Sequence, residues 1–171
     1  MMSAVDAALQ RSADRIIHAV ARLQCSAHRA FEMFTLDGAL QSWLVPLAEV
    51  EPRVGGKYEL FWEPADRENN STIGCRITGL EAGRFLSFEW KGPIQFKRFM
   101  NEADPLTHVV VFFIPGESGD AVSTEVHLIH SGWRSSAEWE EARQWFEVAW
   151  GGAFAELSSK VNDEGRSLAE A

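Results

Sequence analysis

Cysteine is scarce in this sequence: among 171 residues, only Cys25 and Cys75 occur. They form no CxxC motif, so a disulfide scaffold and a cysteine-based zinc site are both disfavoured. Two unpaired thiols suit a reducing compartment, and we expect a cytoplasmic protein.

Long apolar runs and an excess of basic charge are also missing. No stretch of about 18 apolar residues occurs, so no membrane-spanning helix is expected. Residues 1–14 have no basic flank followed by an apolar block, which gives no indication of a secretory signal. Lysine and arginine total 16 against 25 aspartates and glutamates, for a net charge of −9. Phosphate backbones repel such a chain, so nucleic acid is not an expected partner.

The aromatic residues are abundant but skewed, with seven tryptophans and eleven phenylalanines beside a single tyrosine. The overall balance, 46% hydrophobic and 24% charged, is that of one globular domain with a real core. Tryptophan is large and fills a two-layer core unevenly. The composition therefore indicates either a bulky solid core or a core with a hollow that binds a ligand.

The order of the predicted elements defines a single domain over residues 15–161, with a loose lead-in at 1–14 and a frayed tail at 162–171. Strands are expected where apolar and polar residues alternate. Ser26 is expected to cap a short helix through Phe34, and a second short helix carries Leu40, Trp43 and Leu44. The expected strands are 15–24, 47–51, 57–63, 71–80, 84–91, 107–114 and 121–130, with turns at 52–56 and 116–120 and a long connection at 92–105.

The last element is the most strongly predicted helix. Ser135 and Glu138 form a capping-box pattern. The apolar positions, which include Trp145 and Phe146, cover a wider arc than the usual stripe of a surface helix. Gly151-Gly152 weakens the helix by about 1 kcal/mol per glycine relative to alanine, which indicates either a close approach by another segment or a notch.

Successive strands joined by hairpin-length loops favour an antiparallel sheet. An apolar sheet face and an apolar helix bury each other, so the sheet is expected to curl around the helix. The nearly continuous apolar run 107–114 suggests a strand buried on both faces. The predicted fold class is α+β: a helix-grip fold with six or seven antiparallel strands, a long C-terminal helix, and two short helices after the first strand.

Four motifs occur in a fixed order along the chain. They are a small polar helix start before an aromatic residue, a tryptophan closing the second short helix, a glycine pair opening a strand, and a His-x-Gly-aromatic corner after the last strand. They correspond to residues 25–31, 43–44, 55–58 and 124–133. In this order they resemble the START-like (SRPBCC) superfamily and, within it, the Aha-type family of activators of heat-shock-protein ATPases.

The resemblance implies an apolar cavity between the long helix and the sheet, and leaves three functions open. The first, which we favour, is non-enzymatic binding of a small apolar or aromatic ligand. The second is a co-chaperone-type module that regulates a heat-shock-protein ATPase in the stress response, with a protein partner. The third is an enzyme similar to polyketide cyclases or aromatases, using His130 and Tyr58.

The candidate ligand-binding residues are those expected to face the interior. His130 is the most interesting, since a histidine can act as an acid or base near neutral pH, but a buried structural histidine is favoured. The histidines have no metal-ligand spacing, and Glu59, Glu63, Glu89 and Glu125 are expected on the outer face; neither metal nor cofactor is expected. The expected ligand-binding residues are Trp43, Tyr58, Leu60, Trp62, Ile73, Ile77, Leu86, Phe88, Trp90, Val126, Leu128, His130, Trp145 and Ala149.

Two further features have modest chemical significance. Cys75 is expected to point inward among apolar neighbours, where a thiol is unreactive. Lys91, Lys97 and Arg98 form a basic stretch with Phe96 and Phe99. That stretch could be an anion or partner site, but we favour a solvated loop whose aromatic rings fold over the pocket mouth.

Overall fold

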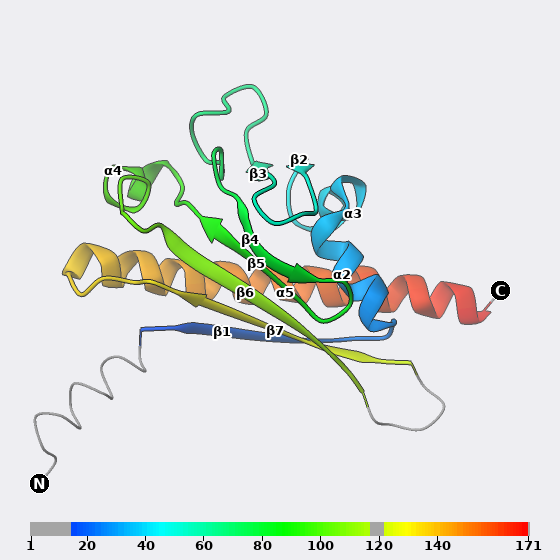
Figure 1. The fold of residues 1–171 in the computed structure, drawn as a ribbon. Coiled ribbons are helices and arrows are strands. Elements are labelled where there is room, and N and C mark those ends of the chain that lie inside the picture. Colours follow the sequence, from blue (N-terminus) through cyan, green and yellow to red (C-terminus); the bar gives the residue numbers. More distant parts are fainter. Residues whose placement is uncertain (1–14, 117–121, 171) are drawn as a thin grey trace, which may run out of the picture.

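A twisted antiparallel sheet lies against one long helix in the computed structural model of the protein (Figure 1). The structure describes residues 15–116 and 122–170; the expected lead-in 1–14 and most of the expected turn 116–120 lie outside them. The elements are β1 (Ile17–Leu23), α2 (Ala27–Thr35), α3 (Asp37–Trp43), β2 (Leu47–Val50), β3 (Tyr58–Phe61), β4 (Ile77–Glu81), β5 (Phe85–Trp90), η1 (Ile94–Phe96), α4 (Lys97–Met100), β6 (Thr107–Pro115), β7 (Thr124–Ser131) and α5 (Ala137–Glu170).

The seven described strands divide into two antiparallel sheets. Five form a sheet in the order β1-β7-β6-β5-β4, and β2 pairs with β3. Two isolated bridges, Lys57 with Arg76 and Phe61 with Ser71, pair β3 and the residue before it with the segment that leads into β4. The expected strand 71–80 is regular only from Ile77, because Gly74 has a φ of +85° and turns the backbone before it.

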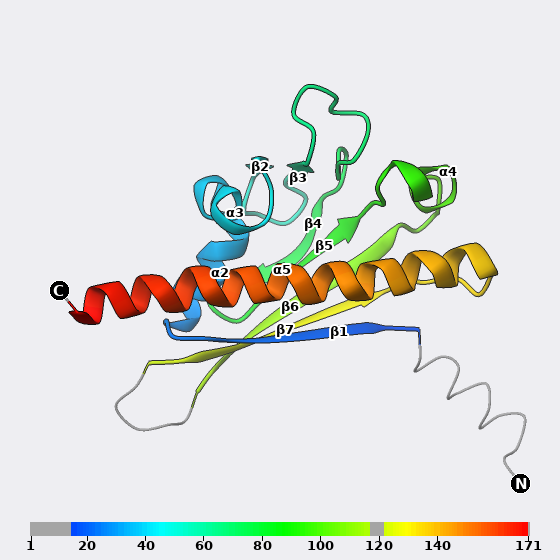
Figure 2. The same cartoon turned by 180° about the vertical axis from the view of Figure 1, so that it is seen from behind.

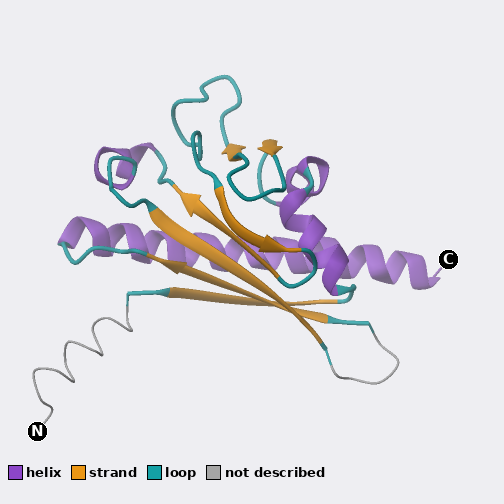
Figure 3. Cartoon of the chain, viewed as in Figure 1, coloured by secondary structure: helices purple, strands orange, loops and turns teal. Residues whose placement is uncertain are grey.

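Burial alternates along the strands that face the helix. In β7 every second side chain from Thr124 to His130 is buried, as the sequence predicted. The expectation that β6 is buried on both faces is wrong, since Phe112 and Ile114 are 43% and 50% exposed. The helix covers only one face of the sheet, and the other face of β6 meets solvent (Figure 3).

Strand β3 is more buried than the predicted alternation of buried and exposed residues. All four of its residues are buried, including Phe61 and Glu59, which were expected to face outward. The Arg67 guanidinium lies 4.6 Å from the centroid of the Phe61 ring and covers its outer side. Glu59 accepts a hydrogen bond of 2.7 Å from the Gly74 N–H, so its carboxylate is used within the protein.

Helix α5 runs along the length of the sheet, with β1 and β7 beside it in Figure 2. Its cap is Ser136 rather than the expected Ser135: the Ser136 Oγ accepts from the Trp139 N–H at 3.3 Å, and Glu138 instead pairs with Arg98. The helix continues to Glu170, past the expected end at 161. Among the described residues, no helix is both long and apolar enough to cross a membrane.

The buried stripe of α5 is narrower than the sequence predicted, because only one side of the helix meets the sheet. Trp145 is 41% exposed, whereas Phe146 is buried. The stripe repeats every three or four residues, as expected for a helix packed on one surface. Its members are Trp139, Ala142, Phe146, Trp150, Phe154, Leu157 and Val161.

The two glycines in the middle of α5 are not held by a close neighbour. A Cβ at Gly151 or Gly152 would meet no atom within 4 Å, so the close-approach interpretation is wrong and the notch remains. Gly151→Ala should therefore raise the free energy of unfolding by about 0.5–1 kcal/mol, through helix propensity and reduced freedom of the unfolded chain. Urea denaturation measures this change.

Gly55→Ala is a control for Gly151→Ala, and its effect on the free energy of unfolding should have the opposite sign. Gly55 has a φ of +80°, which an alanine adopts only with strain, so this variant should lose stability. If Gly151→Ala also lowers the urea midpoint, position 151 needs its glycine for a reason other than the absence of neighbours.

Candidate ligand-binding site

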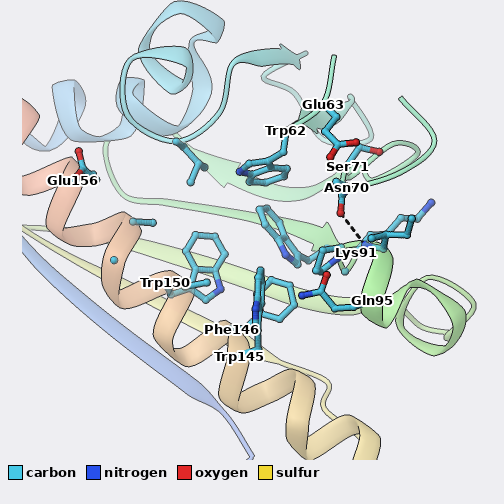
Figure 4. Close-up of a pocket in the computed structure, with 18 of the residues that line it drawn as sticks. Trp62, Glu63, Asn70, Ser71, Lys91, Gln95, Trp145, Phe146, Trp150 and Glu156 are labelled. Carbon is cyan, nitrogen blue, oxygen red and sulfur yellow. Dashed lines mark hydrogen bonds between the residues drawn. The ribbon is translucent and has the colours of Figure 1, made fainter. Parts of the chain in front are cut away.

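A pocket of about 640 Å³ lies between the middle of α5 and the ends of β3 and β5 (Figure 4). The connection 92–105 was expected to lack regular structure, but it folds into η1 and α4, and its first residues close one side of the pocket. Five of the seven tryptophans of the chain line this space: Trp43, Trp62, Trp90, Trp145 and Trp150.

The indole rings come from separate parts of the chain and differ in exposure. Trp90 at the end of β5 and Trp150 on α5 are almost fully buried, with ring centroids 5.1 Å apart. Trp62, just after β3, meets Trp90 edge to face at 5.9 Å and is 38% exposed. Trp145 is similarly exposed and packs on Phe96 at 5.8 Å. The pocket thus has a buried aromatic floor and half-exposed aromatic walls.

Small residues of α5 leave the space open. Ala149, Gly152 and Ala153 line the pocket at positions where a solid core would carry larger side chains. The spacing of these residues puts them on the helix face next to Trp150, so the hollow results from the sequence of α5.

Polar side chains gather at the rim. The Asn70 Oδ1 accepts from the Ile94 N–H at 2.9 Å, and this bond attaches the loop after β3 to η1 (Figure 4). The Lys91 ammonium donates to the Ile73 carbonyl at 2.6 Å. By contrast, the side chains of Glu63, Gln95 and Glu156 make no hydrogen bond or ion pair with any other described residue.

The structure brings five of the fourteen expected ligand-binding residues to this pocket: Trp43, Trp62, Trp90, Trp145 and Ala149. The other nine do not line it. The ring centroids of Tyr58 and Phe88 stack 3.9 Å apart and both side chains are fully buried, so this part of the interior is filled. Ile73 is half-buried, and the remaining members of this group are core residues: Tyr58, Leu60, Ile77, Leu86, Phe88, Val126, Leu128 and His130.

Several lining residues were missed by sequence reasoning. Pro93, Ile94 and Gln95 lie in a connection without periodicity, and nothing in their pattern marks them. Trp150 could have been found, because it lies on the apolar face of the predicted helix one position from Ala149. Phe96 is buried against Trp145, in agreement with the interpretation that aromatic residues of this segment fold toward the pocket.

His130 is a buried structural histidine outside the pocket. Its Nδ1 accepts from the Trp150 indole N–H at 3.1 Å, which places its proton on Nε2, where it donates to the Thr107 Oγ1 at 3.0 Å. Burial lowers the pKa of His130 to about 3. The ring is therefore neutral at physiological pH, with both nitrogens used inside the protein.

Most other buried polar groups on the residues expected to face the interior are also used within the protein. The Tyr58 hydroxyl donates to the Phe34 carbonyl at 2.9 Å, and burial raises the pKa of this phenol. Burial likewise raises the pKa of the Cys75 thiol to about 12, which leaves it unreactive. The Trp90 indole N–H is buried and has no partner among the described residues.

No group of three or more histidine, cysteine, aspartate or glutamate side chains able to hold a metal ion occurs in residues 15–116 and 122–170.

A curved antiparallel sheet that holds a long C-terminal helix, with two short helices after the first strand, defines this chain as a protein of the helix-grip class. Residues 24–162 match the model of the family described as activator of Hsp90 ATPase homolog 1-like protein. The chain belongs to that family, as its motifs indicated. A search of curated proteins finds no significant match.

Solved structures share the fold at low sequence identity. A protein from Mesorhizobium loti has a TM-score of 0.66 and 16% identity, covering 88% of this chain and 98% of its own. An HSP90 activator from Plasmodium falciparum has a TM-score of 0.62 and 20% identity, with 87% and 96% covered. An Aha1 dimer from Colwellia psychrerythraea has a TM-score of 0.63 and 14% identity, with 85% and 95% covered.

Proposed function

We propose that this protein binds a small apolar or aromatic molecule in the tryptophan-lined pocket without converting it. The observation that carries the proposal is the convergence of five tryptophans on one space of about 640 Å³, within the range of small-molecule sites. A solid core would bury these rings against each other, but Trp62 and Trp145 are both more than one-third exposed.

The expected affinity is weak. Burying about 200 Å² of apolar ligand surface contributes roughly 5 kcal/mol before the entropy of association is subtracted. A binding free energy of that size corresponds to a Kd of about 0.2 mM, so binding by apolar contact alone is submillimolar at best. The buried Trp90 indole N–H offers one hydrogen-bond donor, so most of the binding free energy comes from apolar and aromatic contact.

Filling the pocket tests the proposal. A neutral hydrophobic dye should bind the wild-type protein with an increase in dye emission. Ala149→Trp adds an indole at the half-buried helix position that lines the space, and it should weaken dye binding at least tenfold while the protein stays folded. Circular dichroism and the urea midpoint check the fold.

A matched control separates the pocket from the rest of α5. Val148→Trp adds the same side chain at the neighbouring position, which is 78% exposed and outside the pocket, and it should leave dye binding unchanged. Equal dye binding by the Ala149→Trp variant and the wild type would overturn the proposal, as would unfolding of the Ala149→Trp variant, which would mean that the site is close-packed.

A second candidate function, a co-chaperone-type protein-interaction module, is favoured by family membership and by apolar residues on the sheet face opposite α5. On that face Val20 and Phe112 flank His127 across neighbouring strands and are 49% and 43% exposed. This candidate predicts that Phe112→Ser abolishes any stimulation of an Hsp90-class ATPase while dye binding persists.

The cyclase-like alternative has the weakest support. His130 and Tyr58, the two residues that it requires, do not line the pocket and are hydrogen-bonded within the core. A ligand in the pocket would therefore meet neither of them without a rearrangement of the core.

A further inference from the structure

The walls of the pocket are indole rings, and these rings have electrostatic as well as apolar properties. Trp62 and Trp145, which stand on opposite elements, expose more than one-third of their surface (Figure 4). The face of an aromatic ring carries negative electrostatic potential, and tryptophan attracts organic cations more strongly than tyrosine or phenylalanine does.

The rim adds negative charge to this aromatic lining. Glu63 follows directly after Trp62, and Glu156 comes from α5 on the other side of the pocket (Figure 4). Neither carboxylate forms an ion pair with another described residue, in contrast to Glu49, which pairs with Arg67. No described side chain therefore competes with an entering cation for either carboxylate.

Lys91 is the one basic residue in the lining formed by residues 15–116 and 122–170, and its ammonium group bonds to the protein backbone. It donates to the Ile73 carbonyl at 2.6 Å, and it lies 3.3 Å from where a Cβ at Gly74 would stand. Neither Ile73 nor Gly74 lines the pocket. Among the described residues no arginine lines the pocket, so an anionic headgroup would find no free cationic partner in this lining.

We propose that the pocket prefers organic cations, such as quaternary ammonium compounds or protonated aromatic amines, over neutral and anionic molecules of the same shape. This inference rests on the proposed function and specifies its ligand class. The net charge of −9 acts in the same direction, since it raises the concentration of cations near the protein.

Three probes that share one ring system test the preference. They are (1-naphthylmethyl)trimethylammonium, neutral 1-naphthalenemethanol and anionic 1-naphthoate, each measured by isothermal titration calorimetry at low salt. The cation should bind about tenfold more tightly than the alcohol, which corresponds to the combined effect of indole faces and two exposed carboxylates. The naphthoate should bind most weakly.

Variants locate the source of the preference. Glu63→Gln and Glu156→Gln should each weaken the cation about threefold and leave the alcohol unchanged. Glu141→Gln, the same change on α5 outside the pocket, should leave both unchanged. Trp145→Leu should reduce the ratio of cation to alcohol affinity, and Trp145→Phe should restore part of it.

The outcomes separate this inference from the function on which it rests. Equal affinities for the cation and the alcohol, or tighter binding of naphthoate, would overturn the cation preference while leaving the pocket as a ligand site. If none of the three probes binds, and Ala149→Trp alters no titration, both the preference and the proposed function fail.

Discussion

Acidification from pH 6.5 toward 3 is expected to destabilise the protein by about 1.4 kcal/mol per pH unit through His130 alone. The folded-state pKa of about 3 lies below the usual value of 6.5, because the neutral ring is buried. Between these two pH values the unfolded chain takes up a proton that the folded protein does not. Stability is therefore intact above pH 6.5, and the total loss approaches about 4 kcal/mol near pH 3.

The interval from pH 6.5 to 5 isolates the histidine contribution. Hydrogen bonds from arginine or histidine lower the pKa values of Glu49, Glu125 and Glu140 from 4.5, so the acid loss associated with these carboxylates occurs at lower pH. Burial also lowers the pKa of His108, which adds a loss of the same sign. His108→Gln measures that part separately.

Urea denaturation at several pH values measures the effect. His130→Gln keeps an acceptor for the Trp150 indole and a donor for Thr107, and it should remove about 1.4 kcal/mol per pH unit from the slope of stability against pH. NMR titration of the folded protein gives a second test that does not depend on a folded variant. Protonation of the His130 ring in the folded state near pH 6.5 would contradict the account.

Phe146→Ala should lower the free energy of unfolding by about 3–5 kcal/mol, much of the stability of a domain of this size. Phe146 lies at the junction of α5 and the sheet and is only 5% exposed. Its ring contacts His130 at 5.5 Å and Trp133 at 5.6 Å, measured between centroids. Removing it leaves a cavity between these rings.

Trp145→Ala is the neighbouring control. The apolar arc predicted from the sequence includes both Trp145 and Phe146, but Trp145 is 41% exposed, so the expected loss is about 1 kcal/mol. Chemical denaturation of both variants measures the difference. Similar losses for the two variants would mean that Trp145 is a core residue and that α5 is rotated relative to this account.

The order of elements could be predicted from the sequence because local signals agree with the global fold. Alternation marks β7 and β5, Ser26 caps α2 as expected, with its Oγ accepting from the Arg29 N–H at 3.1 Å, and the apolar repeat marks α5. The predictions that were wrong concern burial, which depends on the residues that pack against a strand in the folded protein. The outer face of β6 is apolar yet exposed, and Phe61 is buried because Arg67, six residues away, covers it.

The site was only partly predictable for the same reason. The alternation of apolar and polar residues predicts which side chains lie between the sheet and the helix. It does not predict where a cavity remains between these side chains. Tyr58 and Phe88 face inward and stack into solid core, whereas Trp62 and Trp90 lie where α5 presents Ala149 and Gly152. Locating the hollow requires the register of helix against sheet, which no local pattern contains.

The most direct test of the central claim is an NMR titration that follows the seven tryptophan indole N–H signals during addition of a naphthalene probe. The pocket account predicts that the largest shifts occur at the five lining tryptophans, Trp43, Trp62, Trp90, Trp145 and Trp150, while Trp139, which lies outside the pocket, stays unchanged. Single tryptophan-to-phenylalanine variants assign the signals. Shifts confined to Trp139 and to backbone signals of the exposed sheet face, or no shifts at all, would contradict it.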